Sequence, residues 1–293
     1  MKSIHNILIA TDFSEHSDYA LLMGAKLQKK TNAKVTLVHI SDVPPLWYWS
    51  VHNPEARAII DDFQKETNDN LEEKIQDQMK KLDVQFDSKI LFGDNFNLLH
   101  EAIEKEKADL LIMGHRGEKG LFQIGSFAKK MIASSPIPLI ITNSNRPIDK
   151  VACLLDLSSP NTQIIEAGGF TAKIFNAHLS FFSNIPDLSS KALIGLPFAV
   201  GIQMFSDQDK KEIVRNSEDN IMAMDRNIAR EDIHISISQE DVSIALSDEL
   251  EAFNIDLAVM AKHNRGPLEK LFIGSVSKGV IDNFKGSVLI LPA

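Results

Sequence analysis

The stretch ADLLIMGHRGEKGLFQIGS, residues 108–126, joins an apolar run to a loop with three evenly spaced glycines. A short apolar run of this kind is typical of a strand buried on both faces of a sheet. Glycine at such density indicates a backbone that bends sharply or comes close to a ligand, often a phosphate. The closing Gly-Ser pair favours the start of a helix. The stretch therefore predicts a strand, a glycine loop and a helix in succession.

Each part of this stretch has a counterpart in the second half of the chain. The matching segments are 6–14 with 151–158, 108–113 with 255–260, 125–126 with 274–275, and 137–141 with 287–291. The separation between matching residues drifts slowly, from 144 between Asp12 and Asp156 to 149 between the Gly-Ser pairs. Such drift is expected of two copies of one domain with loop insertions. We expect domains at 1–145 and 149–293, joined by a short linker at 146–148.

Short apolar runs alternate with helical patterns within each half. In the first half the expected strands are 7–10, 34–39, 84–91, 109–113 and 139–142, and the expected helices are 17–31, 55–82, 96–107 and 127–133. Alternating strands and helices favour a parallel sheet with helices on both faces. The sequence thus predicts an α/β protein of two repeated, doubly wound domains, each a five-stranded parallel sheet flanked by helices. Ligands of such sheets bind at the carboxyl ends of the strands, where strand order reverses.

The composition excludes several classes of protein. The net charge of −9 disfavours non-specific binding to nucleic acid and to anionic membrane surfaces. No segment approaches the roughly 18 apolar residues of a membrane span. The single cysteine, Cys153, lies in an apolar run, and we expect it to be buried and inert. A cytoplasmic protein is expected.

The combined motifs resemble those of the universal stress protein family. They are the strand ending in Asp-x-Ser, the run Ala-Asp-Leu-Leu-Ile-Met-Gly, the Gly93-Asp94 pair, and the glycine loop closing in Gly-Ser before a helix. The resemblance covers essentially the whole chain as a tandem pair of domains. It implies an adenine nucleotide alpha hydrolase-like fold and a stress-response function. It also implies that the two halves pair through their last strands, with a homodimer as a further possibility.

Some members of this family bind ATP through Gly-x2-Gly-x9-Gly-Ser/Thr after the fourth strand, and both halves depart from that pattern. The first half has Gly114-x2-Gly117 but only seven residues before Gly125-Ser126. The second half keeps the full length but carries Ala261 and Asn264 in place of the leading glycines. The loops therefore fit two hypotheses, a phosphate cradle or an ordinary strand-to-helix turn. ATP, with magnesium if ATP binds, is the cofactor that the resemblance implies, and we expect it in the first half.

The resemblance carries nucleotide contacts over to positions in both halves. In the first half they are Asp12, Ile40, Gly114, Gly117, Gly125, Ser126 and Phe127. In the second half they are Asp156, Phe182, Asn264, Gly274, Ser275 and Val276. The aspartates fit helix capping equally well, and Ile40 and Phe182 also fit the core. The lone histidine of the first glycine loop, His115, is expected to be a polar loop residue.

No standard catalytic signature is present. The sequence lacks a Walker lysine motif, a G-x-G-x-x-G fingerprint, H-E-x-x-H, C-x-x-C and G-x-S-x-G. We therefore expect no catalytic residue and no metal site. Any ATP hydrolysis is expected to be slow and incidental to binding.

One aromatic segment supports an alternative function. Trp47, Tyr48 and Trp49 follow the second expected strand, at the edge where ligands bind. The matching segment 186–205 is also apolar. Such segments either complete the core or form an apolar lid or partner surface. The alternative is therefore a nucleotide-free scaffold, or a carrier of a hydrophobic small molecule or partner protein.

Overall fold

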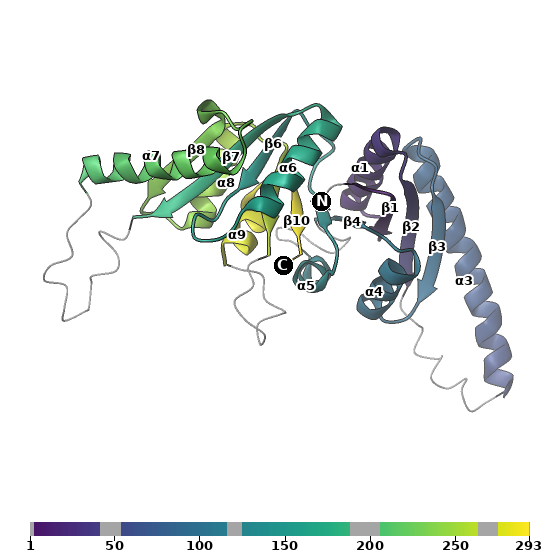
Figure 1. Ribbon diagram of the computed structural model, residues 1–293. Coiled ribbons are helices and arrows are strands. Elements are labelled where there is room, and N and C mark those ends of the chain that lie inside the picture. The colour runs from purple at the N-terminus through teal and green to yellow at the C-terminus, as the bar shows by residue number, and fades with distance from the viewer. Residues whose placement is uncertain (1–2, 42–53, 116–124, 188–205, 263–274, 293) are drawn as a thin grey trace, which may run out of the picture. The chain divides into compact units, whose positions relative to one another are not determined.

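A computed structural model describes residues 3–41, 54–115, 125–187, 206–262 and 275–292. The chain divides into two compact units (Figure 1). Domain 1 comprises Ser3–Asn145 and domain 2 comprises Arg146–Leu291. The glycine-loop residues Gly117, Asn264 and Gly274 and the Trp47–Trp49 segment lie outside the described residues.

Domain 1 alternates strands and helices along the chain. Its elements are β1 (Asn6–Thr11), α1 (Glu15–Thr31), β2 (Lys34–Ser41), α3 (Pro54–Lys81), β3 (Asp87–Phe92), α4 (Asn95–Lys105), β4 (Leu110–Gly114), α5 (Ser126–Ser134) and β5 (Leu139–Thr142). The strands are parallel and lie in the order β3-β2-β1-β4-β5. The predicted doubly wound, five-stranded domain is confirmed.

Domain 2 repeats this architecture. Its elements are β6 (Lys150–Leu154), α6 (Thr162–Phe175), β7 (His178–Pro186), α7 (Asp207–Met224), the short 3-10 helix η1 (Arg230–Asp232), β8 (Ile233–Ser238), α8 (Val242–Ala252), β9 (Leu257–Ala261), α9 (Ser275–Asn283) and β10 (Ser287–Leu291). Its parallel strands lie in the order β10-β9-β6-β7-β8. The two domains therefore share one topology.

The central strands form the hydrophobic core of each domain. In domain 1, Leu8 and Leu110–Ile112 have no exposed surface, and Leu257–Val259 are equally buried in domain 2. Each buried aliphatic side chain of this size stabilises the fold by about 1.5–3 kcal/mol. Cys153 lies in β6 and is fully buried, as expected. Burial raises the pKa of its thiol, so the group stays protonated and unreactive.

The third strand of domain 1 begins later than the sequence predicts. We expected it at 84–91, but β3 runs from Asp87 to Phe92. The preceding residues form the exit of α3, where Asp83 adopts a positive φ of 52°. The Val84 amide donates back to the Met79 carbonyl at 3.0 Å. The residues of this turn are partly apolar, and in the sequence alone that pattern is typical of a strand.

The topology of domain 1 determines where a crevice can form at the edge of its sheet. From β1 the chain crosses to β2 and β3, and then returns past β1 to β4 and β5. Because parallel crossovers are right-handed, α1 and α3 cover one face of the sheet while α4 and α5 cover the other. Figure 1 shows α3 and α4 on opposite sides of β3. The order reverses between β1 and β4, so a crevice is expected at their carboxyl ends.

Candidate functional site

A cavity of about 370 Å³ lies at this switch point of domain 1. Residues of the strands β1, β2 and β4 and of the helices α1, α4 and α5 line it. The lining residues are Ala10, Thr11, Asp12, Ser17, Val38, Ile40, Asn95, Leu99, Met113, Gly114, Gly125, Ser126, Phe127 and Ala128. Small-molecule sites typically enclose about 300–1,000 Å³, and the volume of this cavity lies within that range.

The cavity brings together the contacts expected in the first half of the chain. Of the seven residues carried over, all but Gly117 line it, and Gly117 lies outside the described residues. These residues are far apart in sequence and come from β1, β2, β4 and the start of α5. Their convergence is a property of the fold, since the carboxyl ends of parallel strands share one edge.

The Asp12 carboxylate lies at the end of β1 and is exposed. Its Oδ1 accepts hydrogen bonds from the Ser14 amide at 3.1 Å and the Ser14 hydroxyl at 2.6 Å. Ser14 is the N-cap of α1, where its side chain accepts from the Ser17 amide. The structure thus gives the capping role to Ser14, and Asp12 acts one step earlier by orienting that serine.

Gly114 has a structural reason to be glycine. A Cβ at this position would lie 2.7 Å from the carbonyl carbon of His16, which is backbone and has little freedom to move. The start of α1 therefore packs directly on the end of β4. The matching Ala261 is accommodated in domain 2, where α6 begins only at Thr162, eight residues after β6 ends. Close helix packing accounts for Gly114 without a phosphate.

The Gly125-Ser126 pair opens helix α5, as the sequence predicts. Gly125 is the N-cap, at φ −58° and ψ 146°, and it supplies no side-chain acceptor to the first turn. The first amides of a helix carry partial positive charge and favour anions. Since Gly125 and Ser126 line the cavity, this helix start borders it. An anionic group bound there would satisfy amides that the glycine leaves uncapped.

His115 differs from the polar loop residue that we expected. Only 2% of it is exposed. Its amide donates to the Thr142 carbonyl at 2.9 Å, and its own carbonyl accepts from the Gly125 amide at 3.1 Å. Its ring lies 6.2 Å from the ring of His16. The residue after β4 therefore continues the sheet edge and anchors the start of α5.

Several cavity residues were not predicted, and Asn95 is the most informative of them. Asn95 is the first residue of α4 and lines the cavity. Its Oδ1 is buried and has no hydrogen-bond partner among the described residues. An enclosed amide oxygen without a donor is unfavourable. Polarity directly after the Gly93-Asp94 pair is the one sequence signal that marks it.

The electrostatics of the cavity are simple. Asp12 carries the only formal charge among the described lining residues. Apolar side chains, Val38, Ile40 and Leu99, form the wall between β2 and α4. In the described parts of the chain, no cluster of three or more His, Cys, Asp or Glu side chains is placed to hold a metal ion. Within those same residues, no helix is long and apolar enough to cross a membrane.

Domain 2 arranges its matching residues differently. Both Asp156 oxygens accept hydrogen bonds from its own turn, from Ser158 and Ser159. Ser275 begins α9, and Val276 in its first turn is 37% exposed. Asp156 therefore has a local structural role in this turn.

Phe182 does not occupy the position that matches Ile40. It pairs with Leu154 in the sheet, as Val38 pairs with Ala10 in domain 1. Counting two residues further along each strand, Asn184 is the counterpart of Ile40. Phe182 is fully buried, with its ring 4.7 Å from that of His234 and 5.3 Å from that of Phe253. Its packing corresponds to the core alternative of the sequence hypothesis.

Comparison with known proteins gives one family for both halves. The model of the universal stress protein family matches residues 3–143 and again 147–292. Universal stress protein MJ0531 of Methanocaldococcus jannaschii is 28% identical over 137 residues, covering 46% of this chain and 79% of that protein. Stress response protein NhaX of Bacillus subtilis is 29% identical over 158 residues, covering 46% of this chain and 95% of that protein.

Solved structures match the chain over both halves at once. A universal stress protein from Archaeoglobus fulgidus aligns with a TM-score of 0.64 at 19% identity, covering 98% of each chain. A putative universal stress protein from Pseudomonas aeruginosa aligns with a TM-score of 0.67 at 16% identity, covering 99% of this chain and 94% of the other. At these identities the likeness is one of fold.

Proposed function

The chain belongs to the universal stress protein family as a tandem member, and from this we propose that it is a cytoplasmic stress-response protein that binds ATP in domain 1. Binding, without efficient catalysis, is its activity. The observation that carries the proposal is the cavity at the β1–β4 switch point, lined by Asp12, Ile40 and the Gly125-Ser126 helix start.

The lining fits the parts of an adenine nucleotide. The apolar wall of Val38, Ile40 and Leu99 suits a planar base, because bases are buried against aliphatic surface. The first amides of α5 suit a phosphate. Magnesium would bind together with ATP. Asp12 suits hydroxyl donors of the ribose. Asn95 adds an amide that can contact a polar base edge.

The absence of a hydrolytic centre among the described lining residues supports binding over turnover. Efficient phosphoryl transfer uses cations and a positioned metal ion to neutralise developing charge. The described lining supplies one carboxylate and no lysine or arginine. Ligand binding would then act by favouring one conformation or partner affinity over another. We also propose that the two domains pair through their last strands and that the chain can form a homodimer.

The apolar wall also keeps the alternative function open. A hydrophobic small molecule would use Val38, Ile40, Leu99 and Met113 but would gain nothing from the start of α5. Such a carrier would bind apolar ligands as tightly after the helix start is blocked. The two functions therefore differ in their dependence on Gly125.

Calorimetric titration of the purified chain with ATP and magnesium tests the proposal, after native mass spectrometry for a co-purified ligand. Gly125→Val blocks the helix start, and its extended backbone accepts valine without strain. Gly274→Val, at the matching position in domain 2, is the control. We expect one ATP to bind to the wild-type chain and to Gly274→Val, with binding lost in Gly125→Val. No heat at millimolar ATP would overturn the proposal and favour the apolar carrier.

A further inference from the structure

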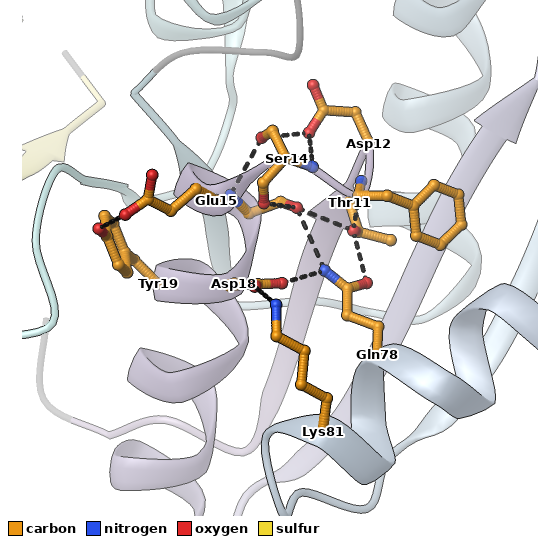
Figure 2. Close-up of polar contacts among 10 residues, drawn as sticks. Thr11, Asp12, Ser14, Glu15, Asp18, Tyr19, Gln78 and Lys81 are labelled. Carbon is orange, nitrogen blue, oxygen red and sulfur yellow. Dashed lines mark hydrogen bonds and ion pairs between the residues drawn. The ribbon is translucent and has the colours of Figure 1, made fainter.

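Side chains of helix α3 form hydrogen bonds with the turn that contains Asp12. This turn runs from Thr11 to Ser17, and Thr11, Asp12 and Ser17 line the cavity. Figure 2 shows Gln78 and Lys81 of α3 reaching the turn and the start of α1. Gln78 lies more than sixty residues along the chain from Ser17, so the contact is made by the tertiary fold.

Gln78 uses both ends of its amide in this contact. Its Oε1 lies 3.0 Å from the Thr11 hydroxyl, and because a carbonyl oxygen only accepts, the hydroxyl donates. Its Nε2 donates to Asp18 Oδ1 at 2.6 Å and to Ser17 Oγ at 3.3 Å. Gln78 is 7% exposed, so these bonds are largely shielded from water. One side chain thus ties the end of β1 to the start of α1.

The turn itself is strained and needs such support. Phe13 has a φ of 66°, a conformation that bulky residues seldom adopt. Its amide donates to the Thr11 hydroxyl at 3.1 Å. Its ring lies 4.6 Å from the His39 ring and 5.9 Å from the Lys74 ammonium. Lys74 and Gln78 are one helical turn apart on α3. One stretch of α3 therefore contacts the Phe13 ring and also the residues before and after Phe13.

Domain 2 forms its matching turn without the long helix. Leu155 precedes Asp156 where Thr11 precedes Asp12, and it is buried. Met224 of α7, nine residues before β8, matches Gln78, nine residues before β3, and is 48% exposed. The turn is closed instead by Asn161, which bonds both the amide and the carbonyl of Asp156, at 3.1 and 2.9 Å. Among the described residues, the link between the turn and the long helix is therefore specific to domain 1.

We propose that Gln78 is a positioning residue for the domain 1 cavity, through which helix α3 sets the place of Asp12. The claim rests on the proposed function, because the ligand concerned is the adenine nucleotide. Energetic linkage is reciprocal, so a ligand that fixes Asp12 also stabilises the part of α3 around Gln78. Among the described residues of domain 2, the matching turn has no such contact with α7, so the coupling is proposed for domain 1 alone.

Hydrogen exchange of the ligand-free chain is the first test. Gln78→Met introduces the residue found in domain 2, and Gln76→Met makes the same change at an exposed position on α3. We expect the amides of residues 13–18 to exchange roughly tenfold faster in Gln78→Met, the effect of losing about one net hydrogen bond. Gln76→Met should match the wild type. Equal protection in the two variants would overturn the inference.

Titration with adenosine and with ATP is the second test, on the same proteins. We expect affinity to fall roughly tenfold in Gln78→Met and to stay unchanged in Gln76→Met. Urea denaturation of the same variants gives their stability alongside. A loss of stability in Gln78→Met without a loss of affinity would show a merely structural role and overturn the inference. A wild-type chain that binds neither ligand would instead overturn the proposed function, and the positioning claim with it.

Discussion

The end of β4 and the start of α1 pack so closely that a Cβ on Gly114 would lie 2.8 Å from the His16 carbonyl oxygen. The Thr142 hydroxyl contacts that oxygen at 3.3 Å, which ties β5 to the same point. Glycine at the head of the loop thus serves the packing of domain 1 whether or not a nucleotide binds.

Gly114→Ala is expected to destabilise domain 1. The added methyl group meets backbone rather than a flexible side chain, so α1 or β4 must shift, at a cost of about 1–3 kcal/mol in the free energy of unfolding. Ala261→Gly, the reverse change at the matching position of domain 2, should cost no more than about 1 kcal/mol. Urea denaturation of both variants measures the difference. Equal stability of Gly114→Ala and the wild type would contradict the packing explanation.

Asn95→Leu is expected to separate stability from binding. It replaces a buried amide whose oxygen has no partner among the described residues with an apolar group of similar size. The melting temperature of the ligand-free chain should stay equal or rise, while ATP affinity falls roughly tenfold as a polar contact to the base is lost. Asn97→Leu, at an exposed position on the same helix, should change neither quantity. A drop in stability without a drop in affinity would assign Asn95 to the fold.

The pH dependence of stability is expected to include a contribution from His39. Burial lowers the pKa of this ring, an effect partly opposed by its hydrogen bond to the Thr11 carbonyl at 2.9 Å. The unfolded chain then binds more protons than the folded one, so stability is present above the unfolded pKa, about 6.5, and is lost as pH falls below it. In His39→Asn the amide can keep the bond to Thr11 but does not titrate. Denaturation at several pH values should show a shallower loss of stability in this variant, whereas the exposed His5→Asn should follow the wild type.

The fold was predictable because buried parallel strands are nearly continuous apolar runs. Leu110–Met113 and Leu139–Ile141 are unmistakable in sequence and form nearly all of β4 and β5, where they are buried. The internal repeat supports the assignment further, because the strands and helices predicted in one half match those predicted in the other. The predicted start of β3 was wrong because apolar residues such as Val84 lie between the end of α3 and the strand.

The site was predictable only where a residue belongs to a local motif. Asp12 and Gly125 carry such motifs, and both line the cavity. Gln78 and Asn95 do not, because their importance comes from contacts made across the fold. The assignment of Phe182 shows a different difficulty. Counting from the apparent end of a strand loses two residues, and only the pairing of β6 with β7 reveals that Asn184 matches Ile40.

Asp12 and Ser14 are expected to respond in opposite ways to alanine substitution. Ser14 caps α1 through its side chain, so Ser14→Ala should lower the free energy of unfolding by about 1 kcal/mol, as loss of an N-cap does, and change ATP affinity little. Asp12 orients that serine with one carboxylate oxygen and lines the cavity, so Asp12→Ala should lose most of its ATP affinity at a smaller cost in stability. Calorimetry and urea denaturation of the two variants give both quantities. Since the residues are two positions apart in one turn, a shared structural effect would move both quantities in parallel, and only a direct role of Asp12 at the ligand separates them.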